Sequence, residues 1–319
     1  MSNPTTTVPV PEEVGLLYDR LTALDTAAQG GSLHLGYWDL DDNEVPLVEA
    51  ADRLTDLMTD ALRLDKGHQV LDVGCGVGQP AMRIAERTGA HVTGIAISRD
   101  QIARATELAE AAGLADKVEF RHADAMELPF PDNSFDAAIA IESIFHMPDR
   151  ERVFSEIRRV LRPGGRLVLT DFFERAPIPA DKQPAVDRLL RDFIMTLARP
   201  EDYVPMLSRA GLRFVELRDI TEQSVAPDLR ADEPQRAGPG PRLRRGRGRE
   251  VQPRGHDRRR RVRLRPADRA EARLRRQGAS AAPSPPPATR PAVKGRGRPD
   301  QATDFRRTPV NALLRSQVL

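Results

Sequence analysis

Three glycines at alternate positions follow a short apolar run that contains one acidic residue, Asp72. The run is Val70-Leu71-Asp72-Val73, the glycines are Gly74, Gly76 and Gly78, and a stretch with helical periodicity follows directly. Strand, tight turn and helix in this order are typical of a Rossmann-type nucleotide site, because glycine lets the backbone approach a ligand closely. A dinucleotide site usually reads G-x-G-x-x-G, so the spacing D-x-G-x-G-x-G departs from that pattern.

A histidine and an aspartate further along the chain could move a proton. His146 follows the predicted fourth strand, and Asp171 follows the predicted fifth strand. An unperturbed histidine pKa near 6.5 suits a general base at neutral pH, and a carboxylate beside it would orient the ring and stabilise the imidazolium. A second interpretation stays open, in which His146 caps the helix that begins at Asp149 or packs beside a bound cofactor.

These residues need a scaffold that brings strand ends together. Strand–helix alternation with short turns predicts an α/β fold, a Rossmann-like, doubly wound and mostly parallel sheet, whose ligands bind at the carboxyl ends of the strands. Strands are predicted at residues 68–73, 91–97, 118–122, 135–141, 166–172 and 213–220. Helices are predicted at residues 12–27, 48–62, 79–88, 98–113, 149–161, 181–197 and 201–210.

The glycine turn resembles motif I of class I S-adenosylmethionine (SAM) methyltransferases. Further segments are similar to one group within that class, the small-molecule O-, N- and C-methyltransferases of natural-product biosynthesis, including those that act on ansamycins and on sugars of glycosylated metabolites. The resemblance covers about Glu13 to Ile220. Its motifs are the His34-Leu35-Gly36-Tyr37-Trp38 segment, the connection from Leu128 to Asp136, Glu142-x-x-x-His146, and Asp171.

The resemblance implies a set of cofactor contacts. Asp72 and the three glycines would meet the amino and carboxyl groups of the SAM methionine, and Asp124 and Ala125 would meet the adenine. An acidic residue usually binds the ribose hydroxyls at the end of the second strand, but Ala96 stands there, so backbone and glutamine contacts are expected instead. The remaining expected contacts are Tyr18, Trp38, Ile97, Ser98, Gln101 and Glu142.

The resemblance also implies the reaction. The chain is expected to transfer a methyl group from SAM, leaving S-adenosylhomocysteine (SAH), to a hydroxyl of a small specialised metabolite, with an amine as the next acceptor and no metal. His146 and Asp171 would act together as the base. Two alternatives remain: a nucleic-acid methyltransferase that uses a basic tail as an RNA arm, and a SAM-binding protein without catalysis. A small-molecule partner is favoured over nucleic acid, and a homo-oligomer stays open.

The composition divides the chain. Residues 231–319 hold 23 Arg, one Lys and eight acidic residues, whereas the whole chain has a net charge of only +2. A Pro- and Arg-rich segment without an apolar face cannot bury enough surface to offset its ordering entropy. The tail at 229–319 is predicted to be either a disordered basic arm or, as we favour, the product of GC-rich DNA that is translated out of frame. The expected domains are a disordered 1–11 and a methyltransferase domain at 12–228 with a helical lid at 12–62.

Cysteine content and hydropathy limit the location of the protein. Cys75 is the single cysteine, so an intramolecular disulfide is excluded. No stretch approaches the roughly 20 apolar residues of a membrane span, and the first residues carry no basic and apolar signal pattern. A cytoplasmic protein without a membrane partner is expected.

Overall fold

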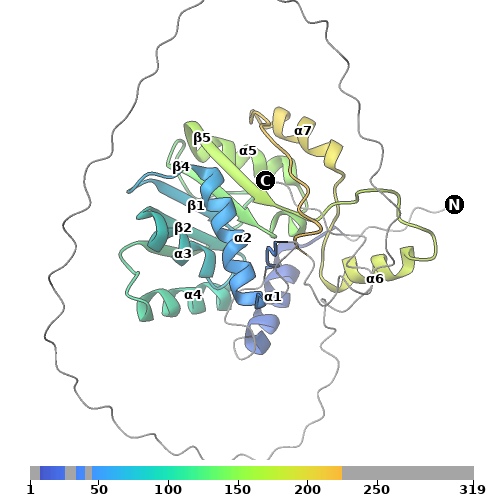
Figure 1. Cartoon of the computed structure of the whole chain (residues 1–319), viewed down its shortest axis with the longest axis horizontal. Helices are drawn as coiled ribbons and strands as arrows, with labels where there is room; N and C mark the ends of the chain where they lie inside the picture. Colours follow the sequence, from blue (N-terminus) through green and yellow to red (C-terminus); the bar gives the residue numbers. More distant parts are fainter. Residues whose placement is uncertain (1–7, 26–33, 40–44, 225–319) are drawn as a thin grey trace, which may run out of the picture. The chain divides into compact units, whose positions relative to one another are not determined.

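The computed structural model describes residues 8–25, 34–39 and 45–224 (Figure 1). Five strands form one sheet in the order β3-β2-β1-β4-β5, and every pair is parallel. The strands are β1 (Gln69–Val73), β2 (His91–Ala96), β3 (Val118–His122), β4 (Phe135–Ile141) and β5 (Leu161–Thr170). The predicted doubly wound parallel sheet is confirmed.

Helices cover both faces of this sheet. They are α1 (Pro11–Asp25), α2 (Leu47–Leu62), α3 (Gln79–Thr88), α4 (Arg99–Ala111), α5 (Arg150–Val160), α6 (Gln183–Asp192), α7 (Pro200–Arg209) and the 3₁₀ turn η1 (Ile144–His146). Within the described residues, none of these helices is long and apolar enough to cross a membrane. The predicted tail at 229–319 and most of the predicted segment 1–11 lie outside the described residues, so both remain predictions.

Alternate residues along each strand point to the two faces, and each face has its own core. Val70 packs with side chains of α2, α3 and α4, whereas Leu71 and Val73 pack with side chains of α5 and α7. In Figure 1 the sheet lies between these two groups of helices. Near-continuous apolar strands such as Val70–Val73 are what a sheet buried on both sides requires.

The order of the strands places the candidate residues together. The chain winds from β1 out to β3, returns to the other side of β1 and continues through β4 to β5, so the strand order reverses between β1 and β4. Ligands of open α/β sheets bind in the crevice at this point. The loop after β1 and the loop after β4 meet there, since the Ser143 hydroxyl donates to the Val73 carbonyl at 2.6 Å.

The predicted sixth strand is wrong. Residues 213–220 form no strand, although Phe214 and Leu217 pack on the core and Ile220 is fully buried. A strand exists through its pairing, and no strand of the described part of the chain pairs with this segment. The sequence beyond Pro227 has no apolar pattern that would predict a further strand to pair with it.

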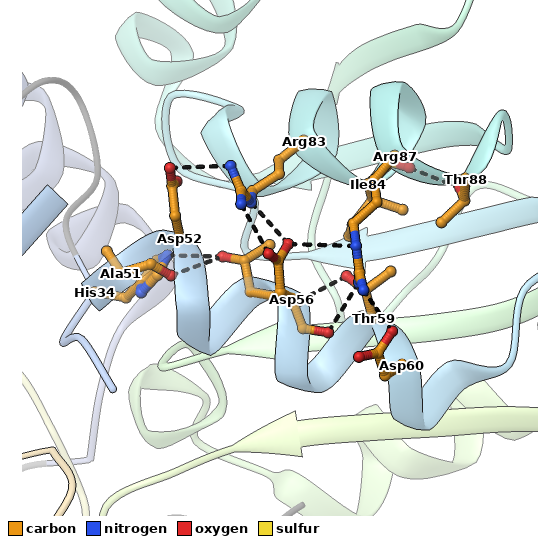
Figure 2. Close-up of polar contacts among 11 residues, drawn as sticks. His34, Ala51, Asp52, Asp56, Thr59, Asp60, Arg83, Ile84, Arg87 and Thr88 are labelled. Carbon is orange, nitrogen blue, oxygen red and sulfur yellow. Dashed lines mark hydrogen bonds and ion pairs between the residues drawn. The ribbon is translucent and has the colours of Figure 1, made fainter. Parts of the chain in front are cut away.

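Charged side chains join α2 to α3 (Figure 2). The Arg83 guanidinium donates to both carboxylate oxygens of Asp56 at 2.8 Å and to Asp52 at 3.0 Å, and Arg87 donates to Asp60 at 2.7 Å. The hydrogen bond from Arg83 holds the pKa of Asp56 below its usual value. This paired geometry orients α2, which also carries the side chains that contact the segment at 34–38.

We predict that Arg83→Met lowers the free energy of unfolding by about 1 kcal/mol, because a half-exposed forked pair is stronger than an ordinary surface pair. Urea unfolding of the full chain measures this, and the loss should shrink in 1 M NaCl as the charges are screened. Lys117→Met, which removes a long exposed pair with Asp116, is the control and should change little. A loss that does not depend on salt would contradict an electrostatic origin.

Candidate functional site

The three glycines after β1 have different reasons to be glycine. All three have positive φ angles, of 82°, 54° and 83°. A Cβ on Gly74 would lie 2.4 Å from Ser143, and one on Gly78 would lie 2.4 Å from Phe120, so both are required by internal packing. A Cβ on Gly76 would have one neighbour within 4 Å in the described part of the chain, Gln101 Nε2 at 3.8 Å. Gly76 is therefore where a ligand can approach the backbone.

Two polar atoms buried beside this turn have no hydrogen-bond partner among the described residues. They are Asp72 Oδ2 and Gln101 Nε2, on side chains that are 1% and 4% exposed. Burial raises the pKa of Asp72 to about 7. One atom needs a donor and the other needs an acceptor, because unsatisfied buried polar groups are costly. An amino-acid zwitterion, with an ammonium and a carboxylate, satisfies both demands, so these residues fit the methionine part of SAM.

The Ser98 hydroxyl has hydrogen-bond partners within the protein both as a donor and as an acceptor. Its hydroxyl accepts from the Gln101 backbone N–H at 3.0 Å, as a helix N-cap does, and donates to Asp19 of α1. Helix α1 approaches closely here, since a Cβ on Gly15 would lie 3.1 Å from the Ile97 carbonyl. That carbonyl also contacts the His122 ring at 3.0 Å. The side chain of Ser98 thus caps α4 and docks α1, whereas a cofactor contact of Ile97 and Ser98 remains a prediction.

Three further predicted contacts have defined surroundings. The carboxylate of Asp124 accepts from the Met126 N–H at 2.8 Å in the loop after β3, beside the buried Ala125. Trp38 is 2% exposed, and its indole N–H donates to the Val45 carbonyl at 2.9 Å. The Trp38 side chain therefore forms part of the packed N-terminal segment, and its contact with a cofactor is untested, as are those of Asp124 and Ala125.

Glu142 connects the N-terminal segment to the end of β4. It has a φ of 48°, a left-handed conformation that is uncommon for a residue with a side chain. Both of its carboxylate oxygens lie 3.2 Å from the Leu35 backbone N–H, which donates to them. Strained backbone of this kind clusters at functional sites. The predicted role of Glu142 toward the cofactor remains untested.

Both ring nitrogens of His146 have partners. Nδ1 lies 3.0 Å from the Ile194 carbonyl, and Nε2 lies 2.7 Å from the Tyr18 hydroxyl. A carbonyl can only accept, so Nδ1 carries the proton and Nε2 presents its lone pair. Burial lowers the pKa of His146 to about 4, and burial with the Glu142 charge raises that of Tyr18. At neutral pH the histidine is therefore unprotonated and the tyrosine is a hydrogen-bond donor.

The expected direct pairing of His146 with Asp171 is wrong. Asp171 is fully buried at the end of β5, where it accepts from the Tyr203 hydroxyl and its own neighbour Phe172 N–H, and lies 3.5 Å from Arg150 Nε. The His146 nitrogens are taken by a main-chain carbonyl and a tyrosine, so no position is left for a carboxylate. Burial raises the pKa of Asp171, and the Arg150 charge opposes this.

Sequence reasoning missed Arg150, Thr196, Tyr203 and the carbonyl of Ile194. The sequence does contain a sign that Arg150 is unusual. It is the first residue of α5, and a cation at this position is repelled by the positive end of the helix dipole. The others have no such sign, since main-chain carbonyls and contacts between distant segments leave no local pattern. Among the described residues, no group of three His, Cys, Asp or Glu side chains could hold a metal ion.

An apolar cluster lies against His146. The rings of Phe145 and His146 are 4.3 Å apart, and those of Phe145 and Phe172 are 5.1 Å apart. The cluster comes from the segment at 34–38, the ends of β4 and β5, and α6 with its following turn. Its members are Leu35, Phe145, Phe172, Met195, Leu190, Phe193 and Leu197.

Several known proteins are similar to this chain in sequence or in fold. A family described as a methyltransferase domain matches residues 71–169. The chain is 42% identical to methyltransferase GfsG of Streptomyces halstedii, over 66% of this chain and 77% of that protein. It is 43% identical to the 27-O-demethylrifamycin SV methyltransferase of Amycolatopsis mediterranei, over 68% and 79%. The solved [4+2]-cyclase SpnF is 38% identical with a TM-score of 0.62, over 69% and 78%. The chain belongs to the family of SAM-dependent methyltransferases.

Proposed function

We propose that this enzyme transfers the methyl group of SAM to a hydroxyl of an apolar small molecule, with His146 as the general base. The observation that carries the proposal is the state of the His146 ring. Its Nδ1–H is fixed on the Ile194 carbonyl, and its Nε2 lone pair already accepts a hydroxyl proton, that of Tyr18. A hydroxyl of the acceptor can take the same place.

The cofactor contacts follow from the two unpartnered atoms. Asp72 Oδ2 would accept from the amino group of the methionine part, and Gln101 Nε2 would donate to its carboxylate. Gly76 would leave room for the chain of the ligand between them. The adenine would lie toward Asp124 and Ala125, at the carboxyl end of β3, because ligands of this fold class bind at the carboxyl ends of the strands.

Positioning does most of the work in such a reaction, because displacement at a methyl group requires the attacking and leaving atoms in line. SAM held by Asp72 and Gln101 would supply an electrophilic methyl group on a positively charged sulfur and would leave as SAH. The acceptor oxygen forms the new bond to carbon, and its proton passes to His146 Nε2. The Ile194 carbonyl stabilises the resulting imidazolium through Nδ1–H.

Tyr18 closes the site in this arrangement. It lies on α1, which is also docked through Asp19 to Ser98 on the cofactor side. Adjacent residues of one helix thus contact the base and the cap of α4. An acceptor must displace the Tyr18 hydroxyl from Nε2, so we propose that α1 shifts when the acceptor binds.

The class of acceptor is argued from the apolar cluster and from the relatives. The side chains of Leu35, Phe145, Phe172 and Met195 favour a largely apolar molecule next to His146. The relatives include the 27-O-demethylrifamycin SV methyltransferase and fungal O-methyltransferases such as rstn1 of Aspergillus nomiae, 39% identical over 68% of this chain. We infer a specialised metabolite with a hydroxyl as the acceptor and an amine as the second choice.

A second candidate reaction is ring closure without methyl transfer. The 38% identity to the [4+2]-cyclase SpnF favours it. A [4+2] ring closure breaks no O–H bond and needs no base, however, whereas His146 is arranged to accept a hydroxyl proton. Mass spectrometry of the product distinguishes the two, because methyl transfer adds one CH₂ unit to the acceptor and ring closure adds none.

We predict that His146→Ala lowers kcat by about 100-fold or more, because a positioned base contributes that much. The affinity for SAH, measured by calorimetry, should stay within about twofold. His68→Ala, at the opposite end of β1, is the control and should retain turnover. An unchanged kcat in the His146 variant would remove the base from the proposal.

The pH dependence of kcat at saturating SAM gives a separate test of His146. The unprotonated form is active, and its pKa is lowered to about 4, so turnover should stay level from pH 8 to about 5.5. An unperturbed histidine would lose half its activity near pH 6.5. A half-loss at that pH would mean that His146 is solvated during catalysis.

The pH dependence of SAH binding tests Asp72. Its pKa is about 7 in the free protein, and an ammonium beside the carboxylate would lower it, so binding releases a proton and tightens as the pH rises. Affinity should be about tenfold weaker at pH 6 than at pH 8. Calorimetry in two buffers of different ionisation enthalpy counts the proton. Asp72→Asn should bind more weakly and lose this dependence, whereas a dependence that persists in the variant would assign it to another group.

A further inference from the structure

The turn at residues 194–196 holds His146 at two points. The Ile194 carbonyl accepts from the His146 ring, and the Thr196 backbone N–H donates to the carbonyl of the preceding residue, Phe145, at 2.9 Å. The Thr196 hydroxyl also lies 3.3 Å from that carbonyl. The position of this turn therefore sets both the ring and the main chain of the proposed base.

Arg150 forms hydrogen bonds with the same turn. Its Nη1 donates to the Thr196 hydroxyl at 2.8 Å, and its Nη2 donates to the Thr196 carbonyl at 2.7 Å. Two parallel donors on a planar group fix direction as well as distance. The fork therefore restrains both the side chain and the backbone of Thr196.

A nearly buried cation at the start of α5 is electrostatically unfavourable without a compensating charge. The Arg150 side chain is 10% exposed, and it begins α5, where the helix dipole repels a cation. The fully buried Asp171 compensates the charge at 3.5 Å and is itself held by the Tyr203 hydroxyl. Asp171 thus acts on the base through Arg150 and not by touching it.

The turn also carries backbone strain. Ile194 is β-branched and has a φ of 50°, a conformation that costs free energy and persists where its surroundings enforce it. The strained residue is the one whose carbonyl binds the His146 ring. An element that holds it in place is therefore needed for the ring to stay oriented.

We propose that Arg150, held by Asp171, is a positioning residue that fixes His146 as its Nδ1–H tautomer by clamping the 194–196 turn. This rests on the proposed function, since it assumes that His146 is the base. With the clamp intact, Nδ1–H stays on the Ile194 carbonyl and the Nε2 lone pair faces the acceptor. Without it, the ring samples both tautomers, and the Nε2–H form cannot accept a proton at Nε2, the nitrogen that faces the acceptor.

The test compares Thr196→Val with Thr196→Ser in the full-length chain. Valine keeps the shape of threonine but loses the hydroxyl between Arg150 and Phe145, whereas serine keeps the hydroxyl. Arg150→Lys keeps the charge beside Asp171 but cannot form the fork. Thr106→Val, an exposed threonine of α4 bonded within its own helix, is the matched control.

Kinetics give the first readout. Thr196→Val and Arg150→Lys should lower kcat by about 10- to 100-fold, as misplaced catalytic groups do, with the KM for SAM and the affinity for SAH within about twofold. Thr196→Ser should recover most of the loss. Equal losses in the valine and serine variants, or a parallel loss of SAH affinity, would indicate a merely structural role and overturn the proposal.

The nitrogen NMR spectrum of the histidine rings gives a readout that needs no acceptor. His146 should show one protonated Nδ1 and one unprotonated Nε2 in the parent chain and in Thr196→Ser, and a mixture of tautomers in Thr196→Val and Arg150→Lys. A spectrum unchanged in both loosened variants would overturn the inference even if methyl transfer is found. A changed spectrum in a chain that transfers no methyl group would keep the inference and reject the proposed function.

Discussion

The two hydrogen bonds of the His146 ring are the constraint on which the site depends. A neutral imidazole has one donor and one acceptor nitrogen, and a main-chain carbonyl on Nδ1 decides which is which. That carbonyl belongs to Ile194, a residue far from His146 in the sequence and held in a left-handed conformation. The lone pair on Nε2 then points to helix α1, where it accepts from the Tyr18 hydroxyl. The direction in which the ring can accept a proton is thus built into the fold.

The other half of the site is defined by buried groups that the protein leaves without partners. Asp72 and Gln101 have opposite hydrogen-bonding demands. The loop after Asp72 carries Gly76, where an added side chain would meet none of the described residues closer than Gln101 Nε2 at 3.8 Å. The reversal of strand order places this loop beside the loop that carries His146, and Ser143 joins the two through the Val73 carbonyl. The proposed cofactor contacts and the proposed base therefore lie on neighbouring loops at the carboxyl ends of β1 and β4.

Periodicity and turn residues predicted most of the fold, because local propensity and burial act in the same direction in a buried parallel sheet. Strands β3 and β4 and helix α3 have the predicted bounds. The helix predicted at 181–197 ends at Asp192, so residues 193–197 are not helical, and the strand predicted at 166–172 already begins at Leu161. The prediction of a strand at 213–220 was wrong because alternating apolar residues indicate that one face is buried but do not show that a neighbouring strand is present. In the site, the residue types Asp72, Gln101 and His146 could be found from motifs. The pairing of Asp171 with Arg150 in place of His146 could not, because the partners of His146 are a distant carbonyl and a tyrosine of α1.

A crystal structure of the chain with SAH would show directly whether the loop after β1 and His146 form one active site. The SAH amino group should lie on Asp72, its carboxylate on Gln101, and its sulfur should be directed toward His146 Nε2 with the acceptor position between them. A sulfur that points away from His146, or a His146 ring whose Nδ1 has left the Ile194 carbonyl, would contradict this arrangement.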